Sequence, residues 1–138
     1  MGNIFKKKFK NTKGAFAESS YKKSVDRMTE EGYAISNGGY FGIAGDASDI
    51  RIIITPNPEE ECLKFFNIFT EDGKIYDKEI EYGGIKELAD GTMVTYRLVT
   101  STVNSPAVDI KYFKDGISKK SKIHFMTEET YGTRKHRK

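Results

Sequence analysis

Residues 107–126 read AVDIKYFKDGISKKSKIHFM, two runs of strand-forming residues on either side of Asp115-Gly116. Aspartate followed by glycine supplies the positive φ angles that a tight hairpin turn requires. The stretch is therefore expected to fold as a β-hairpin. Two more Asp-Gly pairs, at 72–73 and 90–91, also lie between strand-like runs and predict two further hairpins.

The chain from residue 33 onward continues this pattern of short apolar runs separated by turn residues. Asn37-Gly38-Gly39 interrupts the first run, and Pro56-Asn57-Pro58 ends the second. We find no βαβ pattern, so an antiparallel sheet is expected. The seven predicted strands span residues 33–44, 50–55, 62–70, 74–82, 92–103, 107–114 and 117–126.

One amphipathic helix is expected before the strands, at residues 17–31, where Ala17, Tyr21, Val25 and Met28 share one face. The predicted fold class is α+β, with this N-terminal helix followed by an antiparallel meander of about seven strands. Because one short helix cannot cover such a sheet, the sheet is expected to curl, close into a barrel or stack as a sandwich. The residues expected in the core are Val25, Met28, Ile52, Ile54, Phe66, Ile68, Val94, Leu98, Ile110 and Phe125.

The composition narrows the possible classes of protein. The 138 residues are 37% hydrophobic and 31% charged, which excludes collagen-like, disulfide-framework and wholly disordered chains. Cys62 has no second cysteine to pair with, and His124 and His136 are too few for a zinc cluster, so we expect neither a metal nor a cofactor. No apolar run approaches the roughly 20 residues of a transmembrane helix, so no transmembrane segment is expected.

The formal net charge of +3 is divided unevenly along the chain. Residues 1–23 carry +6 and residues 131–138 carry +4, whereas residues 24–130 carry −7. An acidic body with two basic ends is expected to associate through its charge. The expected organisation is a basic flexible arm at 1–16, a single α+β domain at 17–128 and a basic C-terminal tail at 129–138.

Lysine dominates the N-terminal arm and the last hairpin, where Lys111 and Lys114 add to the basic set, and this favours contact with phosphates over reading of bases. The predicted polyanion-binding residues are Lys6, Lys7, Lys8, Lys10, Lys13, Lys119, Lys120, Lys122, Arg134, Lys135, Arg137 and Lys138. Residues 57–90 carry a net charge of −6. The basic arm and the basic tail of one copy could therefore dock on this acidic segment of a neighbouring copy. The residues predicted for this self-association are Glu59, Glu60, Glu61, Asp77, Glu79 and Glu81.

These features predict a non-enzymatic assembly or binding protein whose basic arms dock on a polyanion or on neighbouring copies. The expected partners are a homo-oligomer, other proteins of a large assembly such as a phage particle, or nonspecifically bound nucleic acid. The expected location is the cytoplasm or a virion.

Three alternatives stay open at this point. The first is a small ligand-binding β-barrel lined by Phe41, Phe65, Tyr76 and Tyr96. The second is an inhibitor whose acidic segment mimics nucleic acid. The third is an enzyme that acts on nucleic acid through His124, although a surface histidine on a polar strand face is the simpler interpretation. Cys62 is expected to be a small core residue.

Overall fold

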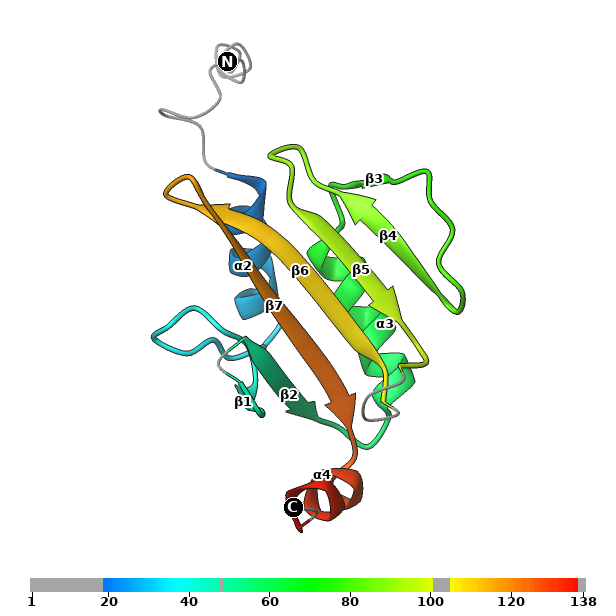
Figure 1. Cartoon of the computed structure of the whole chain (residues 1–138). Helices are drawn as coiled ribbons and strands as arrows, with labels where there is room; N and C mark the ends of the chain where they lie inside the picture. Colours follow the sequence, from blue (N-terminus) through cyan, green and yellow to red (C-terminus); the bar gives the residue numbers. More distant parts are fainter. Residues whose placement is uncertain (1–18, 48, 101–104, 137–138) are drawn as a thin grey trace, which may run out of the picture.

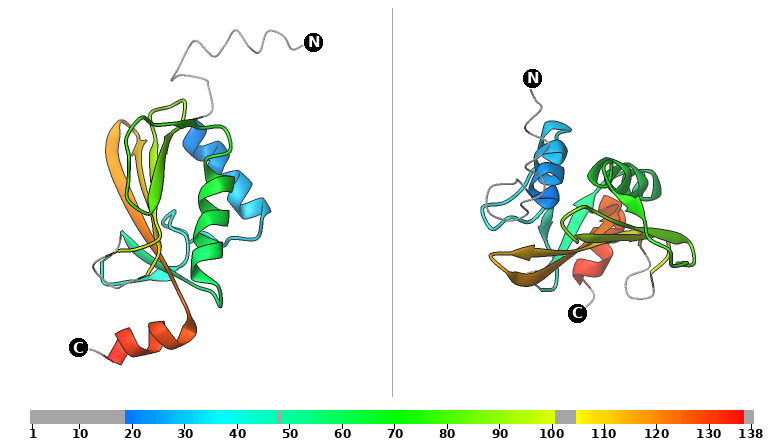
Figure 2. Two further views of the ribbon diagram at one scale, coloured as in Figure 1. Left: turned by 90° about the vertical axis from the view of Figure 1, so that its right-hand side faces the viewer. Right: turned by 90° about the horizontal axis from the view of Figure 1, so that it is seen from above.

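A computed structural model describes residues 19–47, 49–100 and 105–136. Helices α2 (Ser20–Glu30) and α3 (Pro58–Phe69) pack side by side on one face of a seven-stranded sheet (Figure 1). Helix α4 (Glu128–His136) follows the last strand, and its C-terminal end lies on the opposite side of the sheet from α2 and α3 (Figure 2). The α+β class is confirmed.

The sheet has the strand order β1-β2-β7-β6-β5-β4-β3. From β3 to β7, neighbouring strands are antiparallel and follow one another along the chain, as the meander prediction requires. The strands are β1 (Ile43–Ala44), β2 (Ile50–Ile54), β3 (Lys74–Ile75), β4 (Gly83–Glu87), β5 (Met93–Arg97), β6 (Ala107–Lys114) and β7 (Ile117–Met126).

The hairpin at residues 107–126 forms with the predicted strand limits, as β6 and β7. Its turn residues Asp115 and Gly116 have φ angles of 56° and 78°, the left-handed values that the Asp-Gly pair predicts. Asp90-Gly91 likewise turns the chain between β4 and β5, with φ 94° at the glycine. Two of the three predicted hairpins are therefore confirmed.

The prediction of a strand at 62–70 is wrong, because these residues belong to α3. Pro58 stands in the first turn of this helix, and three glutamates follow it there, a favourable arrangement at the positive end of the helix dipole. The buried residues of α3 recur at helical spacing: they are Cys62, Phe65, Phe66 and Phe69. Asp72-Gly73 consequently connects a helix to a strand rather than two strands.

The expectation of a wholly antiparallel meander behind one helix is also wrong. β2 pairs with β7 in parallel, and the sheet is open, with β1 and β3 at its two edges. A second covering helix, α3, explains why closure is unnecessary: together with α2 it buries one face of the sheet. The predicted strand at 74–82 is reduced to β3, and the one at 33–44 to β1 and an isolated bridge between Ile35 and Phe41.

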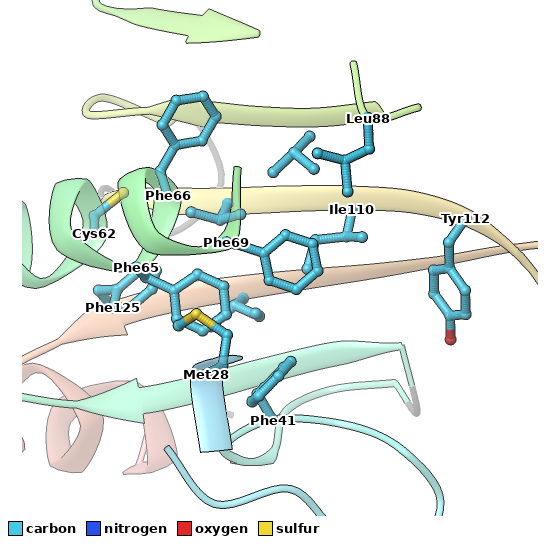
Figure 3. Packing of buried hydrophobic residues seen from close by; sticks show 13 residues of the cluster. Met28, Phe41, Cys62, Phe65, Phe66, Phe69, Leu88, Ile110, Tyr112 and Phe125 are labelled. Atoms are coloured by element: carbon cyan, nitrogen blue, oxygen red, sulfur yellow. The ribbon is translucent and has the colours of Figure 1, made fainter. Parts of the chain in front are cut away.

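The core lies between the two helices and the sheet, and Figure 3 shows its aromatic centre. The Phe65 ring meets Phe41 edge-on at 5.2 Å between centroids and stacks on Phe69 at 5.9 Å. Of the expected core residues, Met28, Ile52, Phe66, Val94, Ile110 and Phe125 are buried, and Val25, Ile68 and Leu98 are partly buried against the cluster. Ile54 is the error, because it lies at the end of β2, beyond the last residue paired with β1, and 42% of its surface is exposed.

Hydrogen bonds stabilise helix α2 at both of its ends. The Ser19 hydroxyl accepts a hydrogen bond from the Lys22 N–H and so caps the helix, close to the start predicted for it. Near the other end, the Arg27 guanidinium donates to the Ile68 carbonyl at 3.0 Å and to Asp72 Oδ2 at 2.6 Å. Arg27 thereby binds α2 to the end of α3.

Candidate functional site

Side chains of β5, β6 and β7 alternate between the helix-covered face and the reverse face of the sheet. Val108, Ile110 and Tyr112 belong to the core cluster and define the covered face. The residues between them on β6, Asp109 and Lys111, therefore belong to the reverse face. Strand pairing brings Arg97, Lys120 and Lys122 to the same face. We call this group of four cations around Asp109 the basic face; its cations are Arg97, Lys111, Lys120 and Lys122.

The one carboxylate of the basic face does not neutralise its four cations. Arg97 Nη1 lies 3.4 Å from Asp109 Oδ2, and Lys122 is paired directly opposite Asp109 in the β6–β7 register. Burial raises the pKa of Asp109, although Lys122, Arg97 and the two other lysines each act to lower it. With Asp109 ionised, the five side chains still carry a net charge of +3.

The strand register also sets two lysines directly against each other. Lys111 on β6 pairs with Lys120 on β7, and both side chains are exposed. Like charges in directly opposite positions destabilise an antiparallel pair. The fold therefore holds two positive charges side by side on a face that α2 and α3 leave open (Figure 2).

An exposed aromatic ring completes the basic face. Phe113 follows Lys111 by two residues on β6, so it points to the same side of the sheet, and 58% of its surface is exposed. A flat ring beside lysines combines a stacking surface with phosphate-binding charge.

The structure brings together only part of the predicted polyanion-binding set. Lys120 and Lys122 lie on the basic face, whereas Lys119 is exposed on the helix side of β7, opposite Tyr112. Arg134 and Lys135 belong to α4. The predicted residues Lys6, Lys7, Lys8, Lys10, Lys13, Arg137 and Lys138 lie outside the described residues. The sequence prediction missed Arg97, which the alternation of β5 could have identified.

The predicted self-association residues come from two separate elements. Glu59, Glu60 and Glu61 form the first turn of α3, where the helix dipole favours acidic side chains, and Glu61 also accepts a hydrogen bond from the Tyr33 hydroxyl. Asp77, Glu79 and Glu81 are exposed in the connection between β3 and β4. The first group has a local structural role that its charge alone did not suggest.

His124 is buried, with 4% of its surface exposed, and the expectation of a surface histidine is wrong. It lies on the reverse face near the end of β7, where Nδ1 is 3.0 Å from the buried Ser105 hydroxyl oxygen. Cys62 is buried in the core as expected, and burial, with a smaller contribution from Glu59, raises the pKa of its thiol to about 12. Neither side chain offers an accessible nucleophile or base.

The four aromatic residues proposed to line a barrel cavity do not converge. Phe41 and Phe65 pack against each other in the core, and Phe66 covers Tyr96, with 4.6 Å between the ring centroids. Tyr76 lies outside the core, 41% exposed, after β3. The open sheet therefore overturns the barrel alternative.

In the part of the chain that the structure describes, no group of three or more His, Cys, Asp or Glu side chains is arranged to hold a metal ion. None of the helices described here is both long and apolar enough to cross a membrane. Compared with protein-family models, with curated proteins and with solved structures, the chain shows no match.

Proposed function

We propose that the protein is a non-enzymatic binding protein that holds single-stranded nucleic acid nonspecifically on its basic face. The observation that carries the proposal is the Lys111–Lys120 pair, two lysines opposed on an uncovered sheet face beside the exposed ring of Phe113. A phosphate between the two ammonium groups would replace their repulsion by two attractions. Bases that stack on Phe113 would add affinity without sequence preference.

The position of α4 supports the same proposal. Its C-terminal end reaches the side of the sheet that carries the basic face (Figure 2), and its sequence includes Arg134 and Lys135. A strand of nucleic acid that follows β7 could pass from the basic face to this helix. Membership of a large assembly such as a phage particle stays a prediction.

The alternative is that the basic face is only a solvated surface, as is common on one side of an antiparallel sheet. Binding of a fluorescent single-stranded oligonucleotide to the full chain separates the two. The double variant Lys111→Gln/Lys120→Gln is expected to lose affinity strongly, with a shallower salt dependence. Each lost phosphate contact should reduce the log–log slope by about 0.7.

A matched control is available on the same two strands. Lys114 and Lys119 are also exposed lysines of β6 and β7, but alternation places them on the helix side. Lys114→Gln/Lys119→Gln removes the same total charge and so the same long-range attraction. Equal losses in both double variants would refute the proposed site and leave only nonspecific attraction to a basic hairpin.

A further inference from the structure

Strand β2 is covered only in part by its outer neighbour, β1. The last pair that β1 makes along β2 is Ile43 with Ile52. Just before this pair the chain turns away at Gly42, where φ is 70° and an added side chain would collide with the Ile52 carbonyl oxygen. β1 therefore cannot continue along β2 toward Ile54.

The backbone polar groups of Ile54 point to this uncovered edge. In the parallel pairing with β7, the Thr55 N–H donates to the Met126 carbonyl at 2.9 Å, and the Lys122 N–H donates to the Asp49 carbonyl at 2.8 Å. The backbone N–H and C=O groups of the odd-numbered residues 49–55 therefore form hydrogen bonds with β7. The N–H and C=O of Ile54 point the other way, and no residue within 19–47, 49–100 or 105–136 pairs with them. Such an edge is a template for an added strand.

An apolar groove of about 280 Å³ lies along the same edge, lined by residues 32–34, 42–43 and 52–54. Ile52 and Ile54 face one side of β2, whereas Ile53 faces the other and packs against the core. Ile43 and Ile54 are 44% and 42% exposed. An extended segment with apolar side chains on both faces would bury these surfaces.

The rim of the groove is acidic. Glu30 and Glu31 are exposed immediately before the lining residues 32–34, and Glu61 accepts a hydrogen bond from the hydroxyl of Tyr33. Burial, Glu61 and Glu31 together raise the pKa of this tyrosine. Two cations lie nearby: Lys64, with Nζ 5.9 Å from the centre of the Tyr33 ring, and Arg51, whose guanidinium donates to the Gly42 carbonyl at 2.9 Å. Three acids against two cations leave the rim acidic and favour an occupant that carries positive charge.

We infer that residues 4–10 of the same molecule, Ile4-Phe5-Lys6-Lys7-Lys8-Phe9-Lys10, add to β2 as an edge strand and fill this groove. The adjacent Ile4 and Phe5 would point to opposite faces of the strand, as the groove requires. The four lysines complement the acidic rim.

The length of the chain permits docking within one molecule. The groove lies at the C-terminal end of α2, about 16 Å along the helix from its first residue, since a residue of α-helix advances about 1.5 Å. The eight residues 11–18, between the docked segment and Ser19, can extend over roughly 27 Å. A second copy is therefore not needed to supply the strand.

Cysteine pairing in the full chain tests the location. The double variant Phe5→Cys/Ile54→Cys is expected to form a disulfide within one molecule under mild oxidation, detected by mass spectrometry. The control, Phe5→Cys/Ile75→Cys, places the second thiol on β3 at the far edge of the sheet, where Ile75 is 82% exposed, and should stay reduced. Cys62 should not compete, because its side chain is fully buried. Equal or absent linkage in the two variants overturns the inference, and a linked dimer overturns docking within one molecule.

Amide hydrogen exchange of the full chain tests the strand pairing itself. The Ile54 amide is expected to be protected from exchange, and Ile4→Asp/Phe5→Asp should remove this protection. The Thr55 amide, bonded to Met126, should stay protected in both proteins and shows that the fold is intact. Free exchange at Ile54 in the unsubstituted chain contradicts the inference. Protection that survives the double substitution means that something else covers the edge, and it contradicts the inference equally.

Discussion

Lys111 and Lys120 lie directly opposite each other on β6 and β7, on the side of the sheet that α2 and α3 leave open. Directly opposed like charges destabilise a strand pair. An anion bound between them would reverse the sign of this contribution. The pair therefore links the stability of the hairpin to the occupancy of the basic face.

Neutralising one of these lysines is expected to stabilise the unliganded protein. Lys111→Gln removes the repulsion and should raise the free energy of unfolding by a few tenths of a kcal/mol in urea at low salt. The gain should shrink at high salt, where exposed charges are screened. Lys114→Gln is the control, because Lys114 pairs with Ile117 rather than with a charge. A gain of the same size in the control would rule out the repulsion as its cause.

Removing the acidic group of the basic face is expected to strengthen oligonucleotide binding. Asp109→Asn raises the net charge of the five side chains from +3 to +4, so its dissociation constant should fall below that of the unsubstituted chain at neutral pH. Unchanged or weaker binding in Asp109→Asn would show that no phosphate approaches this group.

The pH dependence of binding follows from the same residue. Burial raises the pKa of Asp109 in the folded protein, so its charge is lost on acidification at a pH above the usual range of an aspartic acid. Binding by the unsubstituted chain should therefore tighten as the pH falls through that raised value, and binding by Asp109→Asn should show no such step. The measurement is a binding titration repeated over pH, and an identical profile for both proteins would contradict the assignment.

Phe113 is expected to contribute to binding but not to folding. Phe113→Ala should weaken single-stranded oligonucleotide binding by about 1–3 kcal/mol, the range for loss of one stacked base. Its free energy of unfolding should change by less than about 0.5 kcal/mol, as for most exposed positions. Tyr76→Ala, an exposed aromatic residue outside the basic face, serves as the control and should leave affinity unchanged. Equal affinity losses at both positions would exclude a specific stacking role.

Phe65, in contrast to Phe113, is expected to contribute to folding. It is fully buried, and its ring contacts Phe41, Phe69 and Phe125. Phe65→Ala should lower the free energy of unfolding by about 3–5 kcal/mol in chemical denaturation, as large-to-small substitutions in cores do. A loss no larger than that of Phe113→Ala would show that the aromatic cluster is not the centre of the core.

Arg27 is expected to matter more than an ordinary surface charge. Its side chain is 20% exposed and contacts Ile68, Glu71 and Asp72 at the end of α3. Arg27→Ala should lower the free energy of unfolding by about 1–3 kcal/mol, because the Ile68 carbonyl loses a charged donor. Asp26→Ala removes one exposed ion pair with Lys22 and should cost well under 1 kcal/mol. Similar losses in the two variants would argue against a special role for Arg27.

The hairpin of β6 and β7 was predictable because its signals are local. Asp115-Gly116 determines the turn, and the strands on either side are long enough to show their pattern. The apolar stripe of α2 was readable for the same reason.

Helix α3 was misread because its phenylalanines and Cys62 resemble a buried strand when read as a short apolar run. The three glutamates after Pro58 and the spacing of the buried residues were the signals for a helix. The parallel contact of β2 with β7 depends on residues more than 60 positions apart. No local pattern encodes such a pairing.

The candidate site was only partly predictable for a similar reason. Charge runs identified Lys120 and Lys122, but the opposition of Lys111 to Lys120 needs the strand register. The inclusion of Arg97 needs the pairing of β5 with β6. His124 was misplaced because the reverse face of the sheet is buried near the end of β7, where the paired residues Ile52 and Ala107 are also covered.

The most direct test of the basic face is a residue-by-residue map of oligonucleotide binding. Amide chemical shifts of the full chain would be recorded by NMR while a short single-stranded oligonucleotide is added at low salt. The account predicts that the largest changes fall on β5, β6 and β7 at Arg97, Lys111, Phe113, Lys120 and Lys122, and that added salt reverses them. The absence of changes, or changes confined to residues outside these strands, would contradict it.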